Sequence, residues 1–141
     1  MLEKYGKKTD KIIIYTWSAP FHNNSAHYIN YKISNKIHRR SLMKILSIGN
    51  SFSVDATRYL SRAAKRCGKD ITTVNLYIGG CSLYTHYINA LEDLPKYALH
   101  FNGDDTGFLV SIKQALISRE FDIVTLQQAS HFSFKPESYE P

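Results

Sequence analysis

The chain has 141 residues, of which 43% are apolar, and a formal net charge of +6. This length allows one domain with a single core, and the composition indicates neither disorder nor a membrane protein. Its longest apolar runs, such as residues 11–15, are far shorter than a bilayer span, and no secretory signal is expected. Two cysteines, Cys67 and Cys81, form no disulfide framework or metal-ligand spacing, so we expect reduced thiols in a cytoplasmic protein without metal or cofactor.

The positive charge is confined to the first part of the chain. Residues 1–42 hold eight Lys and Arg against two acidic residues, whereas residues 43–141 hold ten of each. We therefore interpret residues 1–42 as a basic N-terminal extension, and we expect that it is translated from an upstream start codon and that Met43 is the natural first residue. The remainder has no electrostatic signature of nucleic-acid or membrane binding.

Regular alternation of strands and helices begins at Met43. Residues 44–48 form a short apolar run that suits a buried parallel strand, and a helix is expected over 54–67 from its i, i+3, i+4 apolar spacing. Residues 71–78 are β-branched and predict a second strand, which runs into Gly79 and Gly80.

The second half continues this alternation. A short helix is expected near 83–94, and segments 97–101 and 106–110 flank a turn and predict a hairpin. A capping box at Ser111 starts a helix to about residue 119, and 121–126 predicts a third buried strand. Strands that alternate with helices predict an α/β fold with a parallel sheet, and the loops after the strands should share one edge, where ligands bind.

Those three loops bring together groups that acyl transfer needs. Ser51 directly follows the first strand and starts a helix, Gly79 and Gly80 end the second, and Gln127 and Gln128 end the third. Ser51 alone is weak evidence, because many serines at such turns only cap the helix. Together, however, the loops offer a nucleophile, backbone N–H donors and a side-chain amide for an oxyanion.

The same residues carry a family resemblance. Ile48-Gly49-Asn50-Ser51 resembles the first block of the SGNH (GDSL-like) hydrolases, Gly79-Gly80-Cys81-Ser82-Leu83 the second, and Leu126-Gln127-Gln128-Ala129-Ser130 the third. The set is most similar to an uncharacterised bacterial SGNH-like subgroup, and the resemblance covers residues 43–141. Asn50 and the glutamines depart from the commonest pattern, towards branches that resemble carbohydrate and sialate esterases.

The resemblance implies a three-layer α/β/α, flavodoxin-like fold, of which the first three strands are present here, in spatial order two-one-three. It implies an esterase acting on a small ester, such as an acylated carbohydrate. Ser51 would be the nucleophile, and the N–H groups of Ser51 and Gly79 or Gly80, with a Gln127 or Gln128 amide, would form the oxyanion hole, with Asn50 supporting the turn.

The D-x-x-H block that supplies the family's base is missing. Asp104, Asp105 and Asp122 have no histidine three residues on, and we expect His86 and His131 to face solvent and His100 to lie far from the site. The chain therefore looks truncated, with negligible esterase activity, and its third strand should be an exposed edge that favours self-association. The alternative is a non-catalytic α/β module that binds a small or phosphate-containing ligand, although no phosphate-loop pattern is present.

Overall fold

A computed structural model of the chain describes residues 12–15 and 42–140, and the described strands form one mixed sheet. The order across the sheet is β1-β6-β2-β3-β4-β5. The strands are β1 (Ile12–Tyr15), β2 (Met43–Gly49), β3 (Ile71–Tyr77), β4 (Tyr97–Phe101), β5 (Asp104–Val110) and β6 (Ile123–Gln127). The first four in this order are parallel, whereas β4 and β5 form an antiparallel hairpin beside β3.

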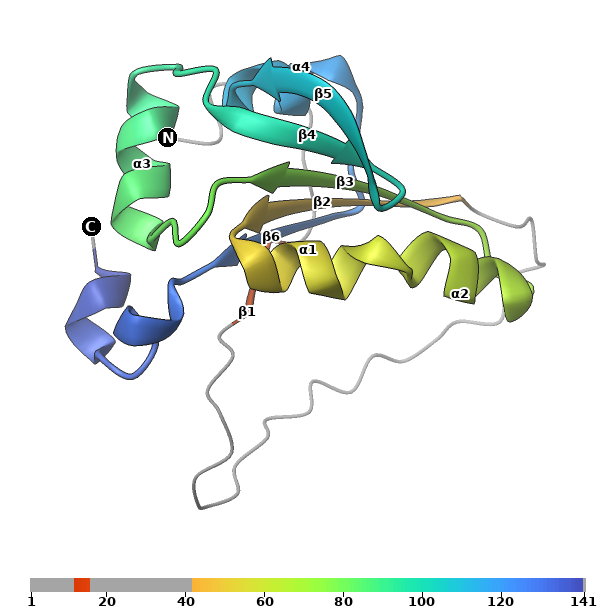
Figure 1. Cartoon of the computed structure of the whole chain (residues 1–141), viewed down its shortest axis with the longest axis horizontal. Helices are drawn as coiled ribbons and strands as arrows, with labels where there is room; N and C mark the ends of the chain where they lie inside the picture. The colour runs from red at the N-terminus through yellow and green to blue at the C-terminus, as the bar shows by residue number, and fades with distance from the viewer. Residues whose placement is uncertain (1–11, 16–41, 141) are drawn as a thin grey trace.

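Helices cover both faces of this sheet (Figure 1). The helices are α1 (Ser51–Arg58), α2 (Leu60–Arg66), α3 (Leu83–Leu91) and α4 (Ile112–Ser118), followed by 3₁₀ turns η2 (Ser130–Phe132) and η3 (Pro136–Tyr139). The first two pack along one face on β2 and β3, and α4 lies against the other. Figure 1 shows α3 and the two 3₁₀ turns at the end of the sheet to which β2, β3 and β6 point.

The two faces differ in chemistry because side chains alternate along each strand. The face towards α4 holds the apolar core, in which Leu46, Ile48, Val74, Leu76, Tyr97, Ile112, Ala115, Phe121 and Val124 are buried. The face under α1 and α2 is polar. Ser47, Thr73 and Asn75 are buried there, and Ser47 and Asn75 are register partners.

Much of the expected architecture is confirmed. The fold is α/β, and the three predicted strands are present in the predicted order, as β3-β2-β6. The hairpin also forms, but it joins the sheet antiparallel to β3, so the expectation of a purely parallel sheet was wrong. The third strand is not an edge either, because β1 pairs with it.

The helix expected over 54–67 is two helices. It begins three residues earlier, at Ser51, and is interrupted at Tyr59, whose φ of −114° and ψ of −2° depart from the α-helix. The apolar spacing continues across the interruption, which is why the sequence pattern did not reveal it.

The remaining sequence predictions concern the N-terminal segment, the thiols and the membrane. Apart from 12–15 and Leu42, the residues assigned to a basic extension lie outside the described residues. Cys67 is exposed and Cys81 is buried, and both thiols are free. Among the described residues, no helix has the length and apolar character that a membrane crossing requires.

Gly103, in the turn between β4 and β5, provides a test of this packing. Its φ is +93°, and a Cβ at this position would overlap the carbonyl group of Arg58 at the end of α1. Gly103→Ala should therefore lower the free energy of unfolding by more than about 2 kcal/mol, because backbone strain and a steric clash add. Urea denaturation measures this loss.

Gly107→Ala is the matched control. Its φ is also positive, at +75°, but nothing lies within 4 Å of the added Cβ. It should lose only the strain, about 1 kcal/mol. Equal losses in the two variants would contradict the close approach of the hairpin turn to α1.

Candidate functional site at the carboxyl edge of the sheet

The loops after β2, β3 and β6 meet at one edge of the sheet, and the side chain of Asn50 joins them. Asn50 is 2% exposed, and its Nδ2 donates to the carbonyl oxygens of Cys81 at 3.3 Å and Gln128 at 3.2 Å. Its Oδ1 accepts from the Phe52 N–H at 3.2 Å and so caps α1. One buried carboxamide thus fixes the position of all three loops, the supporting role that the sequence suggested.

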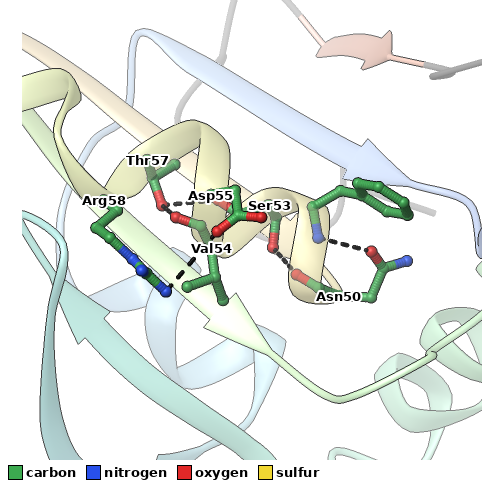
Figure 2. Close-up of polar contacts among 7 residues, drawn as sticks. Asn50, Ser53, Val54, Asp55, Thr57 and Arg58 are labelled. Atoms are coloured by element: carbon green, nitrogen blue, oxygen red, sulfur yellow. Dashed lines mark hydrogen bonds and ion pairs between the residues drawn. The ribbon is translucent and has the colours of Figure 1, made fainter.

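The first turns of α1 are also held from within (Figure 2). The Ser53 hydroxyl donates to the Asn50 carbonyl at 2.7 Å, and the Thr57 hydroxyl donates to the Ser53 carbonyl at 2.8 Å. Both side chains are buried against the sheet. A Cβ on Gly49 would lie 2.7 Å from Gln127 Oε1 and 2.8 Å from Ser53 Cβ, so only glycine allows α1 to approach this closely.

Ser51 is left free by this arrangement. It is the first residue of α1, it is exposed, and its hydroxyl makes no hydrogen bond to any described residue. N–H groups in the first turn of a helix have no intrahelical acceptor, and they favour negative charge nearby. No acidic residue lies in the first turn of α1.

The glycine pair lies on the same edge. The Ile78 N–H donates to the Gly49 carbonyl at 3.1 Å, which places the end of β3 beside the end of β2. Gly79 and Gly80 then turn outwards, and Gly80 has a φ of +63°. Neither N–H is bonded to a described residue, so both remain available as donors.

The two glutamines have different environments. Gln128 is buried, its Nε2 donates to the carbonyl (2.9 Å) and hydroxyl (3.0 Å) oxygens of Ser138, and its Oε1 accepts from the N–H groups of Leu83 and Ala129. Both amide protons are used, so the expectation that Gln128 donates to an oxyanion is corrected. Gln127 is half-buried, and its Oε1 accepts from the backbone N–H of Asn50 at 3.4 Å. Its NH₂ group has no partner among the described residues and stays a candidate donor.

Of the three histidines considered in the sequence, none is hydrogen-bonded to Ser51. His131 is exposed in η2, as predicted, and its ring contacts Phe132 with centroids 4.2 Å apart. His100 is buried in β4, beside the ring of Tyr77. His86 was expected to face solvent, and this was wrong, because it is 1% exposed.

His86 belongs to a buried polar cluster that the sequence analysis missed. Its Nδ1 lies 2.8 Å from Tyr97 Oη and 3.4 Å from Cys81 Sγ, and Asn89 Nδ2 donates to the same Tyr97 oxygen at 3.4 Å. The only sequence signal was the i, i+3 spacing of His86 and Asn89, which places both on one face of α3. Cys81, a member of the cluster, directly follows the glycine pair in the chain.

Burial keeps the groups of this cluster neutral. It lowers the pKa of His86 to about 4, raises that of Cys81 to about 11 and raises that of Tyr97 to about 12. A neutral thiol beside a neutral imidazole is not an activated nucleophile. The cluster therefore supports the glycine loop rather than reacting.

Comparison with known proteins identifies relatives of the region that holds this site. The family model described as "Domain of unknown function (DUF4886)" matches residues 44–141. The crystal structure of a DUF4886 family protein from Bacteroides uniformis is similar, with 35% identity and a TM-score of 0.66. The similarity covers 71% of this chain and 40% of the other, so the chain spans less than half the length of that relative. No curated protein matches the chain.

Asn50→Asp tests the joining of the three loops. Asp caps a helix as well as Asn does, but a carboxylate cannot donate to the carbonyl oxygens of Cys81 and Gln128. We expect the free energy of unfolding to fall by at least about 2 kcal/mol in urea denaturation at neutral pH. Asn102→Asp is the control, because Asn102 uses its Oδ1 to accept from the Thr73 N–H, and aspartate keeps that bond. A stable Asn50→Asp variant would contradict this role.

The lowered pKa of His86 predicts that the folded chain loses stability in acid. Above its ordinary pKa of 6.5 the imidazole is neutral in both the folded and the unfolded chain. As the pH falls from 6.5 towards about 4, only the unfolded chain takes up the proton, so the folded state loses up to about 3 kcal/mol. His86→Gln should remove this part of the pH dependence in urea denaturation, whereas His131→Gln should leave it unchanged. An unaltered pH profile in His86→Gln would refute the assignment.

Proposed function

Because the chain belongs to the DUF4886 family, a domain family of unknown function, we propose that this domain is an SGNH-type serine ester hydrolase with Ser51 as its nucleophile. The observation that carries the proposal is the exposed hydroxyl of Ser51 at the start of α1, which has no hydrogen-bond partner among the described residues. The substrate class is a small ester, such as an acylated carbohydrate.

The candidate hydrogen-bond donors at this edge of the sheet suit the chemistry of acyl transfer. Attack of the Ser51 oxygen on an ester carbonyl makes a tetrahedral intermediate whose oxygen carries a negative charge. The N–H groups of Ser51, Gly79 and Gly80 and the NH₂ of Gln127 are the candidates to stabilise that charge. Preorganised donors of this kind contribute about 3–4 kcal/mol each to catalysis.

The attack also needs a base, because the Ser51 proton must leave as the bond to the carbonyl carbon forms. No described histidine is hydrogen-bonded to Ser51. Loss of the base costs serine enzymes on the order of 10⁴ to 10⁶ in turnover. We therefore expect very slow hydrolysis by this chain.

The second candidate is a non-catalytic module that binds a small anion or phosphate-containing ligand. The start of α1 supports this candidate. N–H groups at a helix N-terminus bind anions, and no acidic side chain lies in the first turn of α1 to repel one. Such a module would use the same donors without a covalent step.

Covalent labelling tests the proposal in this chain. A fluorophosphonate should label Ser51 slowly. Added imidazole should speed the reaction, because it supplies the base that no described histidine offers to Ser51. Mass spectrometry of the tryptic peptides locates the label. Ser51→Ala should abolish labelling without changing stability by more than about 0.5 kcal/mol, because the hydroxyl has no partner among the described residues.

Ser130→Ala is the matched control, because Ser130 is an exposed serine in the loop after β6. It should label as the wild type does. Labelling that persists in Ser51→Ala, or that imidazole does not accelerate, would refute the proposal. Thermal stabilisation by phosphate or a nucleotide, without labelling, would favour the binding module.

A further inference from the structure

The strand β1 lies outside the region that the family model matches, yet it belongs to the same sheet. The family match begins at residue 44, whereas β1 is Ile12–Tyr15. It pairs in parallel with β6, from Ile12 opposite Val124 to Tyr15 opposite Gln127. Without β1, β6 would be the last strand on this side of the sheet.

Without β1, β6 would be an exposed edge strand that can pair with other chains. Its residues read Ile-Val-Thr-Leu-Gln, without a charge, a proline or a glycine. Such a strand presents unpaired N–H and C=O groups that recruit other extended chains. The opposite edge is different, because β5 begins with Asp104 and Asp105 and contains Gly107 at a φ of +75°. Charges and an irregular backbone protect β5, and β6 has neither.

We propose that the side of β6 that faces away from β2 is a strand-binding site. Its occupant is Ile12–Tyr15, a segment of the same chain that covers this edge and prevents self-association. The ligand that the site takes is an extended apolar segment running parallel to β6. The pairing of Tyr15 with Gln127 means that the cap reaches the edge where Ser51 and the glycine pair lie. This proposal does not depend on the esterase proposal.

The geometry of a parallel edge defines the measurement. Successive N–H groups of β6 point alternately to the two neighbouring strands, so one set bonds to β2 and the other to β1. Hydrogen exchange followed by NMR should show that both sets are protected in the wild-type chain. If the set that points away from β2 exchanges like unprotected amides, the cap is absent and the proposal fails.

Two proline variants of the full chain add an internal control. Neighbouring strand residues point their N–H groups in opposite directions, so only one of Ile13 and Ile14 donates towards β6. Of Ile13→Pro and Ile14→Pro, one should therefore accelerate exchange in that alternate set of β6 amides by at least about 100-fold, and the other much less. Similar, wild-type exchange in both variants would refute the pairing.

A synthetic peptide tests whether the site binds a strand supplied from outside. In the disrupted variant, a peptide of residues 10–17 should restore protection of the same β6 amides and suppress larger species in light scattering. The same peptide with proline at the disrupting position should do neither. Deprotected β6 amides that the native peptide does not restore, in a variant that stays monomeric, would overturn the proposal.

Discussion

The arrangement of the candidate site depends on one buried carboxamide. Asn50 accepts one hydrogen bond from the start of α1 and donates two, to the loops that follow β3 and β6. A donor is required there because both targets are carbonyl oxygens. Aspartate at this position could cap α1 equally well, but its carboxylate could not donate to either carbonyl oxygen. One side-chain nitrogen thus links loops that are far apart in the sequence, in addition to the Ile78–Gly49 and Leu83–Gln128 hydrogen bonds.

The polar groups at this edge divide into those that build the site and those left available. Gln128 is fully hydrogen-bonded to Ser138 and to the start of α3, and the Cys81, His86 and Tyr97 cluster is buried and neutral. Ser51 and the glycine N–H groups remain without partners among the described residues. Residue type alone does not separate the two sets, because each contains groups that could take part in chemistry. The hydrogen-bond pattern does.

Local patterns predicted the elements, but contacts between distant segments had to come from the structure. The apolar run 44–48 and the hairpin around Gly103 were read correctly because strand and turn signals are local. The antiparallel addition of that hairpin to β3 was not, since pairing partners leave no mark in one sequence. His86 was misplaced because its partner, Tyr97, lies on a strand eleven residues further on. Gln127 and Gln128 could not be told apart because the point where β6 ends determines which way each turns.

The polar face of the sheet has a consequence for motion. Beneath α1 and α2 lie Ser47, Thr73 and Asn75. The side-chain oxygen of Thr73 and both polar atoms of Asn75 are buried and have no hydrogen-bond partner among the described residues. The helix that begins with Ser51 therefore gains less from apolar burial than α4 does on the opposite face, and it covers groups that would be better solvated. Local opening of such a segment costs less free energy than global unfolding. We therefore expect α1, the helix that begins with Ser51, to open locally at a lower free-energy cost than α4 on the apolar face.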